Sequence, residues 1–219
     1  MTPRTRLVTT SQGEARLVEH RARKPDAVLV LTHGAGGGID ARDLARIAAD
    51  LPGQGISVVL VEMPWRVQGR KLAPRPALID AAYREVLAEL RPPAPFVLGG
   101  RSAGARSACR LASGVGAAGV LALAFPLHPP GHPEKTRLDE LLGVEVPVLV
   151  IQGERDPFGR PEEFPEDVEL AVVPAGDHGL KVPLRRSEAA PVDQDEALGI
   201  VVEATLEWLV REIAGNRSG

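Results

Sequence analysis

A serine flanked by glycines, at the junction of two runs of different character, constrains this chain more than any other feature. The apolar run Phe96-Val97-Leu98 leads into Gly99-Gly100-Arg101-Ser102-Ala103-Gly104, and residues 103–111 are small residues and good helix formers. In a strand–turn–helix context, the pattern G-x-S-x-G holds a serine on a strained turn above the sheet edge. We expect a side chain at position 100 or 104 to collide with the neighbouring strand or helix. The segment predicts a nucleophile elbow at Ser102, with a flexible Gly/Ser loop as the alternative.

Strand-length apolar runs alternate with helical patterns along the rest of the chain. Runs of Val, Leu and Ile are typical of strands buried on both faces; they cover residues 27–32, 56–61, 119–124, 147–152 and 168–173, after two extended segments at 7–10 and 15–20. Apolar stripes at helical spacing cover residues 44–51, 76–90, 134–142 and 197–209. The alternation predicts a single α/β domain over residues 1–219, with a mostly parallel sheet of about seven strands and helices on both faces. The connection over residues 125–134 is too short for a lid domain.

Composition excludes several classes of partner. The formal net charge of −3 gives no electrostatic case for nucleic-acid binding. The apolar runs fall short of the ~20 residues that a membrane span requires, and no long apolar region follows the basic first residues. A single cysteine, Cys109, fits a reducing compartment, and we interpret it as a small core residue. We therefore expect a cytoplasmic protein with no nucleic-acid and no membrane partner; the oligomeric state stays open.

Chemically useful side chains follow three of the expected strands. In open α/β sheets, ligands bind beyond the carboxyl ends of the strands. Ser102 follows one strand, Asp156 lies in Gly153-Glu154-Arg155-Asp156-Pro157 after another, and His178 lies in Gly176-Asp177-His178-Gly179 after the last. A serine hydroxyl needs a base to take its proton, and a carboxylate to orient that base. We predict Ser102 as nucleophile, His178 as base and Asp156 as orienting acid.

Two other carboxylates compete for the role of the acid. Glu154 comes earlier in its loop, and Asp177 adjoins His178, so that a plain loop histidine bonded to Asp177 is the alternative for His178. We favour Asp156 because it lies deeper in the turn, where Pro157 stiffens the backbone.

A glycine-rich loop, His33-Gly34-Ala35-Gly36-Gly37-Gly38, follows the first buried strand. As a phosphate cradle it lacks a Gly-Lys-Ser/Thr sequence or an acidic partner. As an oxyanion loop it fits, because glycines let the backbone approach a substrate. We predict the backbone N–H of Ala103 as one oxyanion donor and that of Ala35 or Gly36 as the other. His33 is expected to order the loop and not to act as a second base.

Basic side chains near the expected site are candidates for substrate binding. Arg66, Arg70 and Lys71 leave a strand end on the active side, and Arg101 lies inside the elbow, so an anionic substrate group is one hypothesis and surface solvation the other. His128 and His132 lie beside prolines with no partner at metal-ligand spacing. We expect no metal and no cofactor, and we interpret His128 as a residue of the site rim or of the structure.

The motifs together resemble a known family. HGAGG at 33–37, GRSAGAR at 100–106, GERDP at 153–157 and GDHG at 176–179 resemble the dienelactone-hydrolase-related branch of the α/β-hydrolases. With Met-Pro-Trp at 63–65 and Gly-Arg-Lys at 69–71, they resemble more narrowly the hydrolase-like family of testis-expressed protein 30 and a subunit of the nonspecific-lethal chromatin complex. The resemblance, over residues 28–208, implies the α/β-hydrolase fold and the triad. Dienelactone hydrolases proper carry cysteine where this chain has Ser102, so their substrate does not transfer.

The expected function is that of a serine hydrolase acting on small esters or thioesters through an acyl-enzyme, without a cofactor. The short 125–134 connection leaves little to enclose a long acyl chain, so we expect short acyl groups. A catalytically idle interaction protein is the main alternative, because some relatives serve as complex subunits. The intact set Ser102, Asp156 and His178 argues against it. Nucleotide binding at residues 34–38 is a third, weaker hypothesis.

Overall fold

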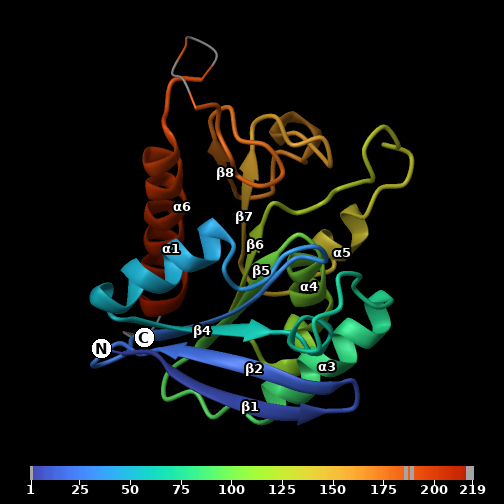
Figure 1. Cartoon of the computed structure of the whole chain (residues 1–219). Coiled ribbons are helices and arrows are strands. Elements are labelled where there is room, and N and C mark those ends of the chain that lie inside the picture. Colours follow the sequence, from blue (N-terminus) through green and yellow to red (C-terminus); the bar gives the residue numbers. More distant parts are fainter. Residues whose placement is uncertain (1, 185–186, 188–189, 216–219) are drawn as a thin grey trace.

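An eight-stranded sheet forms the centre of the protein (Figure 1). This computed structural model describes residues 2–184, 187 and 190–215. The strands follow one another across the sheet in the order β1-β2-β4-β3-β5-β6-β7-β8. Their bounds are β1 (Arg4–Thr10), β2 (Gly13–His20), β3 (Ala27–Thr32), β4 (Ile56–Glu62), β5 (Phe96–Arg101), β6 (Gly119–Leu123), β7 (Val148–Gly153) and β8 (Leu170–Val173).

The sheet is parallel from β4 to β8, and β2 alone runs against its neighbours β1 and β4. All residues of β3, β4 and β6 are buried, which explains why apolar residues dominate these strands. The expected fold is confirmed. The sheet has eight strands against the expected seven or so, because both extended N-terminal segments join it.

Helices cover both faces of the sheet (Figure 1). On one face, α1 (Arg42–Asp50) and α6 (Gln194–Leu209) pack over a core that includes Leu29, Leu121 and Ile151. On the other face, α3 (Pro76–Ala88) and α4 (Ala103–Val115) pack over a second core layer that includes Val30, Leu98 and Val150. Successive strand residues point to opposite faces, so each strand contributes to both layers.

Local departures from the expected elements lie in the loops. A short helix, α2 (Pro64–Val67), occupies part of the expected loop after β4, with Pro64 in its first turn. The helix expected over 134–142 is confined to α5 (Leu138–Leu142). The described segment from 124 to 137 contains neither helix nor strand, so no lid domain rises from it.

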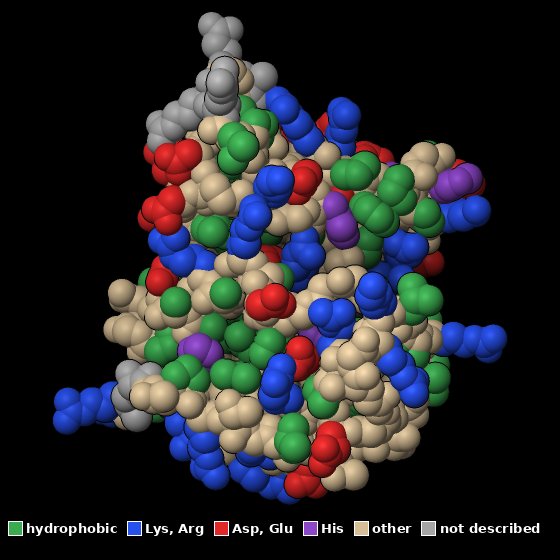
Figure 2. Space-filling model, in the orientation of Figure 1, with side chains coloured by type: hydrophobic (Ala, Val, Ile, Leu, Met, Phe, Trp, Pro, Cys, Tyr) green, Lys and Arg blue, Asp and Glu red, His purple; other side chains and the backbone are tan. Residues whose placement is uncertain are grey.

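The surface mixes charges of both signs. Figure 2 shows basic and acidic side chains on the same face, with apolar side chains between them. This mixture accords with 26 Lys and Arg against 29 Asp and Glu. Within the described residues, no helix has both the length and the apolar character needed to cross a membrane.

Candidate active site

Ser102 occupies a strained turn between β5 and α4. Its backbone angles are φ 53° and ψ −112°, a conformation that side-chain-bearing residues rarely adopt. A Cβ atom on Gly100 would lie 2.7 Å from the carbonyl oxygen of Thr32, and one on Gly104 would lie 2.8 Å from that of His33. The expected collision at both positions is therefore confirmed. The two glycines let the backbone of the turn approach β3 closely enough to hold the serine at the strand ends.

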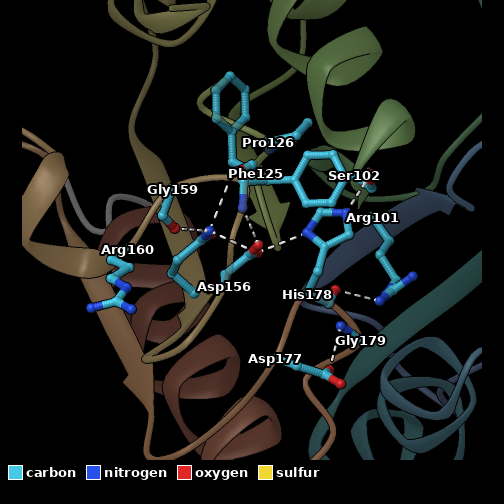
Figure 3. Close-up of polar contacts among 12 residues, drawn as sticks. Arg101, Ser102, Phe125, Pro126, Asp156, Gly159, Arg160, Asp177, His178 and Gly179 are labelled. Carbon is cyan, nitrogen blue, oxygen red and sulfur yellow. Dashed lines mark hydrogen bonds and ion pairs between the residues drawn. The ribbon is translucent and has the colours of Figure 1, made fainter. Parts of the chain in front are cut away.

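The structure brings Ser102, His178 and Asp156 into a continuous line of hydrogen bonds (Figure 3). Ser102 Oγ lies 2.9 Å from His178 Nε2, and His178 Nδ1 lies 2.7 Å from Asp156 Oδ2. A carboxylate can only accept, so Nδ1–H donates to Asp156 and Nε2 accepts the serine hydroxyl. The Asp156 side chain is 0% exposed and that of His178 is 22% exposed. The histidine therefore faces both a buried anion and solvent.

The competing carboxylates have other partners. Glu154 Oε2 accepts from the backbone N–H of Ala175 at 2.6 Å. Asp177 Oδ1 accepts from the N–H groups of Gly179 at 2.6 Å and Lys181 at 3.0 Å, which closes its own turn. Asp156 is thus the one of the three acids whose carboxylate contacts the His178 ring.

Gln152, at the carboxyl end of β7, hydrogen-bonds to the Asp156 carboxylate. Its Nε2 donates to Asp156 Oδ2 at 3.0 Å and to the carbonyl of Gly159 at 2.7 Å, while the N–H of Phe158 donates to Asp156 Oδ1 at 2.8 Å. Gln152 is fully buried. The motif pattern does not predict this residue; the available signal is a polar side chain that follows a buried apolar run. These hydrogen bonds fix the orientation of the Asp156 carboxylate toward the His178 ring.

The glycine-rich loop after β3 lies against the elbow. A Cβ atom on Gly34 would lie 3.3 Å from Ser102 Cβ, and the exposed residues Ala35 and Gly36 come directly after Gly34 in the chain. Ala103 is the first residue of α4, and the N–H of such a residue has no carbonyl partner within its helix. These positions suit the predicted oxyanion donors, whose role stays a prediction.

His33 anchors that loop. Its Nε2 accepts from the N–H of Met63 at 3.0 Å, and its Nδ1 donates to the carbonyl of Gly34 at 2.8 Å. Burial lowers the pKa of His33, so the ring stays neutral in this arrangement. A ring with both nitrogens engaged orders the loop, as expected.

Two of the three predicted substrate-binding side chains are engaged with the protein itself. Arg101 donates through Nη2 to the carbonyl of His178 at 2.5 Å and pairs through Nε with Asp43 at 3.1 Å. His128 is buried, with Nδ1 2.9 Å from the Pro129 carbonyl and Nε2 2.8 Å from Glu163. Both side chains therefore have partners within the protein, and their role in substrate binding stays a prediction.

Arg66 is the third of these residues, and it stands apart. It lies half-buried in α2, with Nη2 3.8 Å from the position of a Cβ on Gly38 in the glycine-rich loop. Its Nε is buried and has no hydrogen-bond partner among the described residues. The neighbouring Arg70 and Lys71 are exposed. Arg66 therefore remains a candidate for contact with an anionic group.

Comparison with known proteins decides the family. A family model described as an alpha/beta hydrolase domain matches residues 25–209. The chain belongs to the α/β-hydrolase family. Dienelactone hydrolase from Anabaena variabilis is similar in structure, with a TM-score of 0.69, 18% identity and coverage of 97% of this chain and 100% of that one.

Other solved structures share this α/β-hydrolase fold. A serine hydrolase without a lid from Xanthomonas campestris superposes with a TM-score of 0.72 and 18% identity, over 95% of each chain. Est1E from Butyrivibrio proteoclasticus superposes with a TM-score of 0.68 and 13% identity, over 94% of this chain and 99% of that one. At such identities the likeness concerns the fold.

The cysteine of this α/β-hydrolase lies away from the elbow apex. Cys109 is buried in α4, and burial raises the pKa of its thiol to about 12. A thiol in that state is a poor nucleophile, which accords with a core role. Among the described residues, no group of three or more His, Cys, Asp or Glu side chains is placed to bind a metal.

Proposed function

We propose that this α/β-hydrolase cleaves small esters or thioesters through a Ser-His-Asp triad and an acyl-enzyme intermediate. One observation carries the proposal: the line from Ser102 Oγ through the His178 ring to the buried Asp156, with contacts of 2.9 Å and 2.7 Å. Side chains that serve only to pack the fold do not require this chain of hydrogen bonds from a hydroxyl through an imidazole to a carboxylate.

In the proposed acylation, His178 acts first as a base and then as an acid. His178 Nε2 accepts the proton of Ser102 Oγ as the oxygen attacks the substrate carbonyl carbon. The N–H of Ala103 and that of Ala35 or Gly36 stabilise the tetrahedral oxyanion. His178 then gives its proton to the departing alcohol or thiol, and Asp156 stabilises the imidazolium meanwhile. The ester bond breaks and the acyl group is left on Ser102.

Deacylation repeats these steps with water. His178 Nε2 takes a proton from a water molecule, whose oxygen attacks the acyl carbon, and Ser102 Oγ leaves with the proton that His178 returns. The products are a carboxylic acid and free enzyme, so atoms and charge balance without a cofactor.

The proposed substrates carry short acyl groups. The segment between β6 and α5, residues 124–137, adds neither helix nor strand above the site, so little protein is available to enclose a long chain. One structure of Est1E, which shares the fold, contains ferulic acid, and a small carboxylic acid of this kind is what hydrolysis of a small ester would release. Acetyl and butyryl p-nitrophenyl esters should therefore give a higher kcat/KM than the palmitoyl ester.

The finer resemblance to the family of testis-expressed protein 30 supports the alternative of an idle interaction protein. The contacts of Gln152 and Phe158 with Asp156 favour the enzyme, because an idle site has no need of a buried, oriented carboxylate. A fluorophosphonate probe separates the two. Labelling of the wild type and loss of labelling in Ser102→Ala, with unchanged thermal unfolding, is the expected result. Equal labelling of both proteins, or of neither, overturns the proposal.

A further inference from the structure

The arginine inside the elbow motif reaches sideways, away from the serine hydroxyl. In Figure 3 the Arg101 side chain extends beside His178 and meets its main-chain carbonyl. Nη2 donates to that carbonyl at 2.5 Å, and Nε lies 3.1 Å from Asp43 Oδ2. The Arg101 side chain is 16% exposed and that of Asp43 is 1% exposed. The pair is thus built into the protein interior beside the site.

Arg101 connects three segments that are not direct neighbours in the sheet. Arg101 itself ends β5, Asp43 lies in the first turn of α1, and His178 lies in the loop after β8. Strands β6 and β7 separate β5 from β8 in the sheet, so no strand pairing joins the elbow directly to the histidine loop. The guanidinium provides that connection directly.

Arg101 contacts the main chain of His178, whereas the other partners described above contact its imidazole ring. Asp156 and Phe158 contact the imidazole ring from the β7 side. Arg101 contacts the backbone of the same residue, and its Nη2 also lies 3.6 Å from the position of a Cβ on Gly179. The ring of His178 is therefore held by residues that follow β7, and its main chain by a residue at the end of β5.

We propose that Arg101, supported by Asp43, is a positioning residue that holds the His178 backbone so that Nε2 stays within hydrogen-bond reach of Ser102 Oγ. This inference rests on the proposed function for its kinetic consequence and on the geometry alone for its structural one. It assigns Arg101 a role different from recognition of a substrate anion.

The chemistry of the side chain explains why arginine suits this position. A planar guanidinium presents Nε and Nη2 in a fixed fork, so one group serves the carboxylate and the carbonyl at once. A lysine ammonium is a point charge on a flexible stem, and we expect it to reach one partner at a time. Burial raises the pKa of Asp43, and the positive charge of Arg101 opposes that effect.

The first measurement is kinetic. Misplacement of a reacting group by about 1 Å lowers rates by about 10²-fold, so Arg101→Ala should lower kcat on p-nitrophenyl acetate by about 10- to 100-fold with KM nearly unchanged. The kcat of Arg101→Lys should lie between those of the wild type and Arg101→Ala. Added methylguanidine should restore part of the rate lost in Arg101→Ala. An increase in KM confined to esters that bear a carboxylate would instead show anion recognition and overturn the proposal.

The matched control is Arg106→Ala. Arg106 is 19% exposed and pairs with Glu140, which is 23% exposed, so this variant removes a partly buried ion pair of an arginine whose described partners do not include His178. We expect a lower melting temperature for Arg106→Ala and an unchanged kcat. If Arg101→Ala behaves in the same way, Arg101 is merely structural and the proposal fails.

The second measurement does not need hydrolysis. In long-range ¹H–¹⁵N spectra of the wild type, the His178 nitrogens should show one donor held by Asp156 and one acceptor bonded to Ser102. Arg101→Ala or, if that variant does not fold, Arg101→Lys should lose the signature of the Ser102 contact. If the wild type shows the signature and the variants keep it, the proposal is wrong. If the wild type is not labelled by fluorophosphonate but the variants lose the signature, the proposed function fails and the positioning role stands.

Discussion

Phe158 stacks on His178, with ring centroids 4.1 Å apart and planes inclined by 29°. Phe158 also donates its backbone N–H to Asp156, so one residue restrains both the ring and its carboxylate partner. Stacked aromatic rings resist rotation about the side-chain torsion that would break the contact with Ser102. The His178 ring is therefore restrained on its face by Phe158 and at its two nitrogens by Ser102 and Asp156.

Replacing this aromatic ring should slow catalysis without unfolding the protein. Aromatic pairs contribute about 0.5–1.5 kcal/mol, and if that restraint acts on the transition state, Phe158→Ala should lower kcat by about 2- to 13-fold. Phe158→Tyr keeps the ring and should retain near wild-type kcat. Steady-state kinetics of the two variants checks this, and an unchanged kcat in Phe158→Ala would contradict it.

The identity of the orienting acid can be tested by three matched amide substitutions. Asp156→Asn should lower kcat by orders of magnitude, because the amide favours the wrong histidine tautomer; in a serine protease the matching change lowers kcat by about 10⁴. Asp177→Asn and Glu154→Gln alter acids whose contacts are to backbone N–H groups, and they should have far smaller effects. A larger loss in Asp177→Asn than in Asp156→Asn would show that the acid is misassigned.

The close approach of the elbow to β3 predicts a large difference between two glycines of one helix. A Cβ on Gly104 would lie 2.8 Å from the carbonyls of His33 and Thr32, whereas one on Gly114 would meet nothing within 4 Å. Gly104→Ala should lower the free energy of unfolding by about 1–3 kcal/mol, as overpacking does. Gly114→Ala, also in α4, should raise it by about 0.5–1 kcal/mol. Urea denaturation of both variants measures the contrast, and equal effects would refute it.

His128 makes stability depend on pH in a defined direction. The Pro129 carbonyl, followed by Glu163, raises the pKa of His128. A pKa raised by folding contributes stability that is fully present below the unfolded value of about 6.5 and is lost as pH rises through the folded value. The melting temperature of the wild type should exceed that of His128→Gln by more at pH 6 than at pH 9.

His132→Gln is the control for that experiment. His132 is 53% exposed and pairs only with exposed Glu134 among the described residues. Its melting-temperature difference from the wild type should stay small at both pH values. A difference for His128→Gln that is the same at pH 6 and pH 9 would show that the His128 charge makes no contribution.

If Arg66 binds an anionic group, the enzyme should prefer substrates with a free carboxylate. A charge-assisted contact contributes about 1.5–3 kcal/mol, so a p-nitrophenyl hemisuccinate should exceed the neutral butyrate in kcat/KM by about 10- to 150-fold. Arg66→Ala should abolish this advantage, and Arg70→Ala, at an exposed position of the same loop, should retain it. If the wild type does not distinguish the two esters, Arg66 has no role in recognition.

The parts of the site that follow strand order could be predicted from sequence. Ser102, Asp156 and His178 each follow a strand, and parallel strands deliver their loops to one edge, so topology alone brings the loops together. Glycines 100 and 104 are predictable for the same reason, because the strand–turn–helix context determines what their backbone must approach.

Side-chain direction could not be predicted in this way. Arg101 and His128 lie in the expected loops, yet their polar atoms point to Asp43 and Glu163, which come from distant segments. Gln152 and Asp43 are ordinary polar residues until burial reveals their partners. Spacing along the chain determines which loop a residue enters; the packing of other loops determines which way its side chain turns.

The separation of the site residues along the chain has a consequence for folding kinetics. The Ser102–His178 and Arg101–His178 hydrogen bonds join residues 76 and 77 positions apart. Such contacts close long loops, and the entropy of closure must be met before they form. We expect the parallel pairing of β5 through β8 to precede them. During refolding, helices and the local hairpin of β1 and β2 should therefore form while Ser102 still lacks its histidine, and the site should assemble at the end of folding rather than at its beginning.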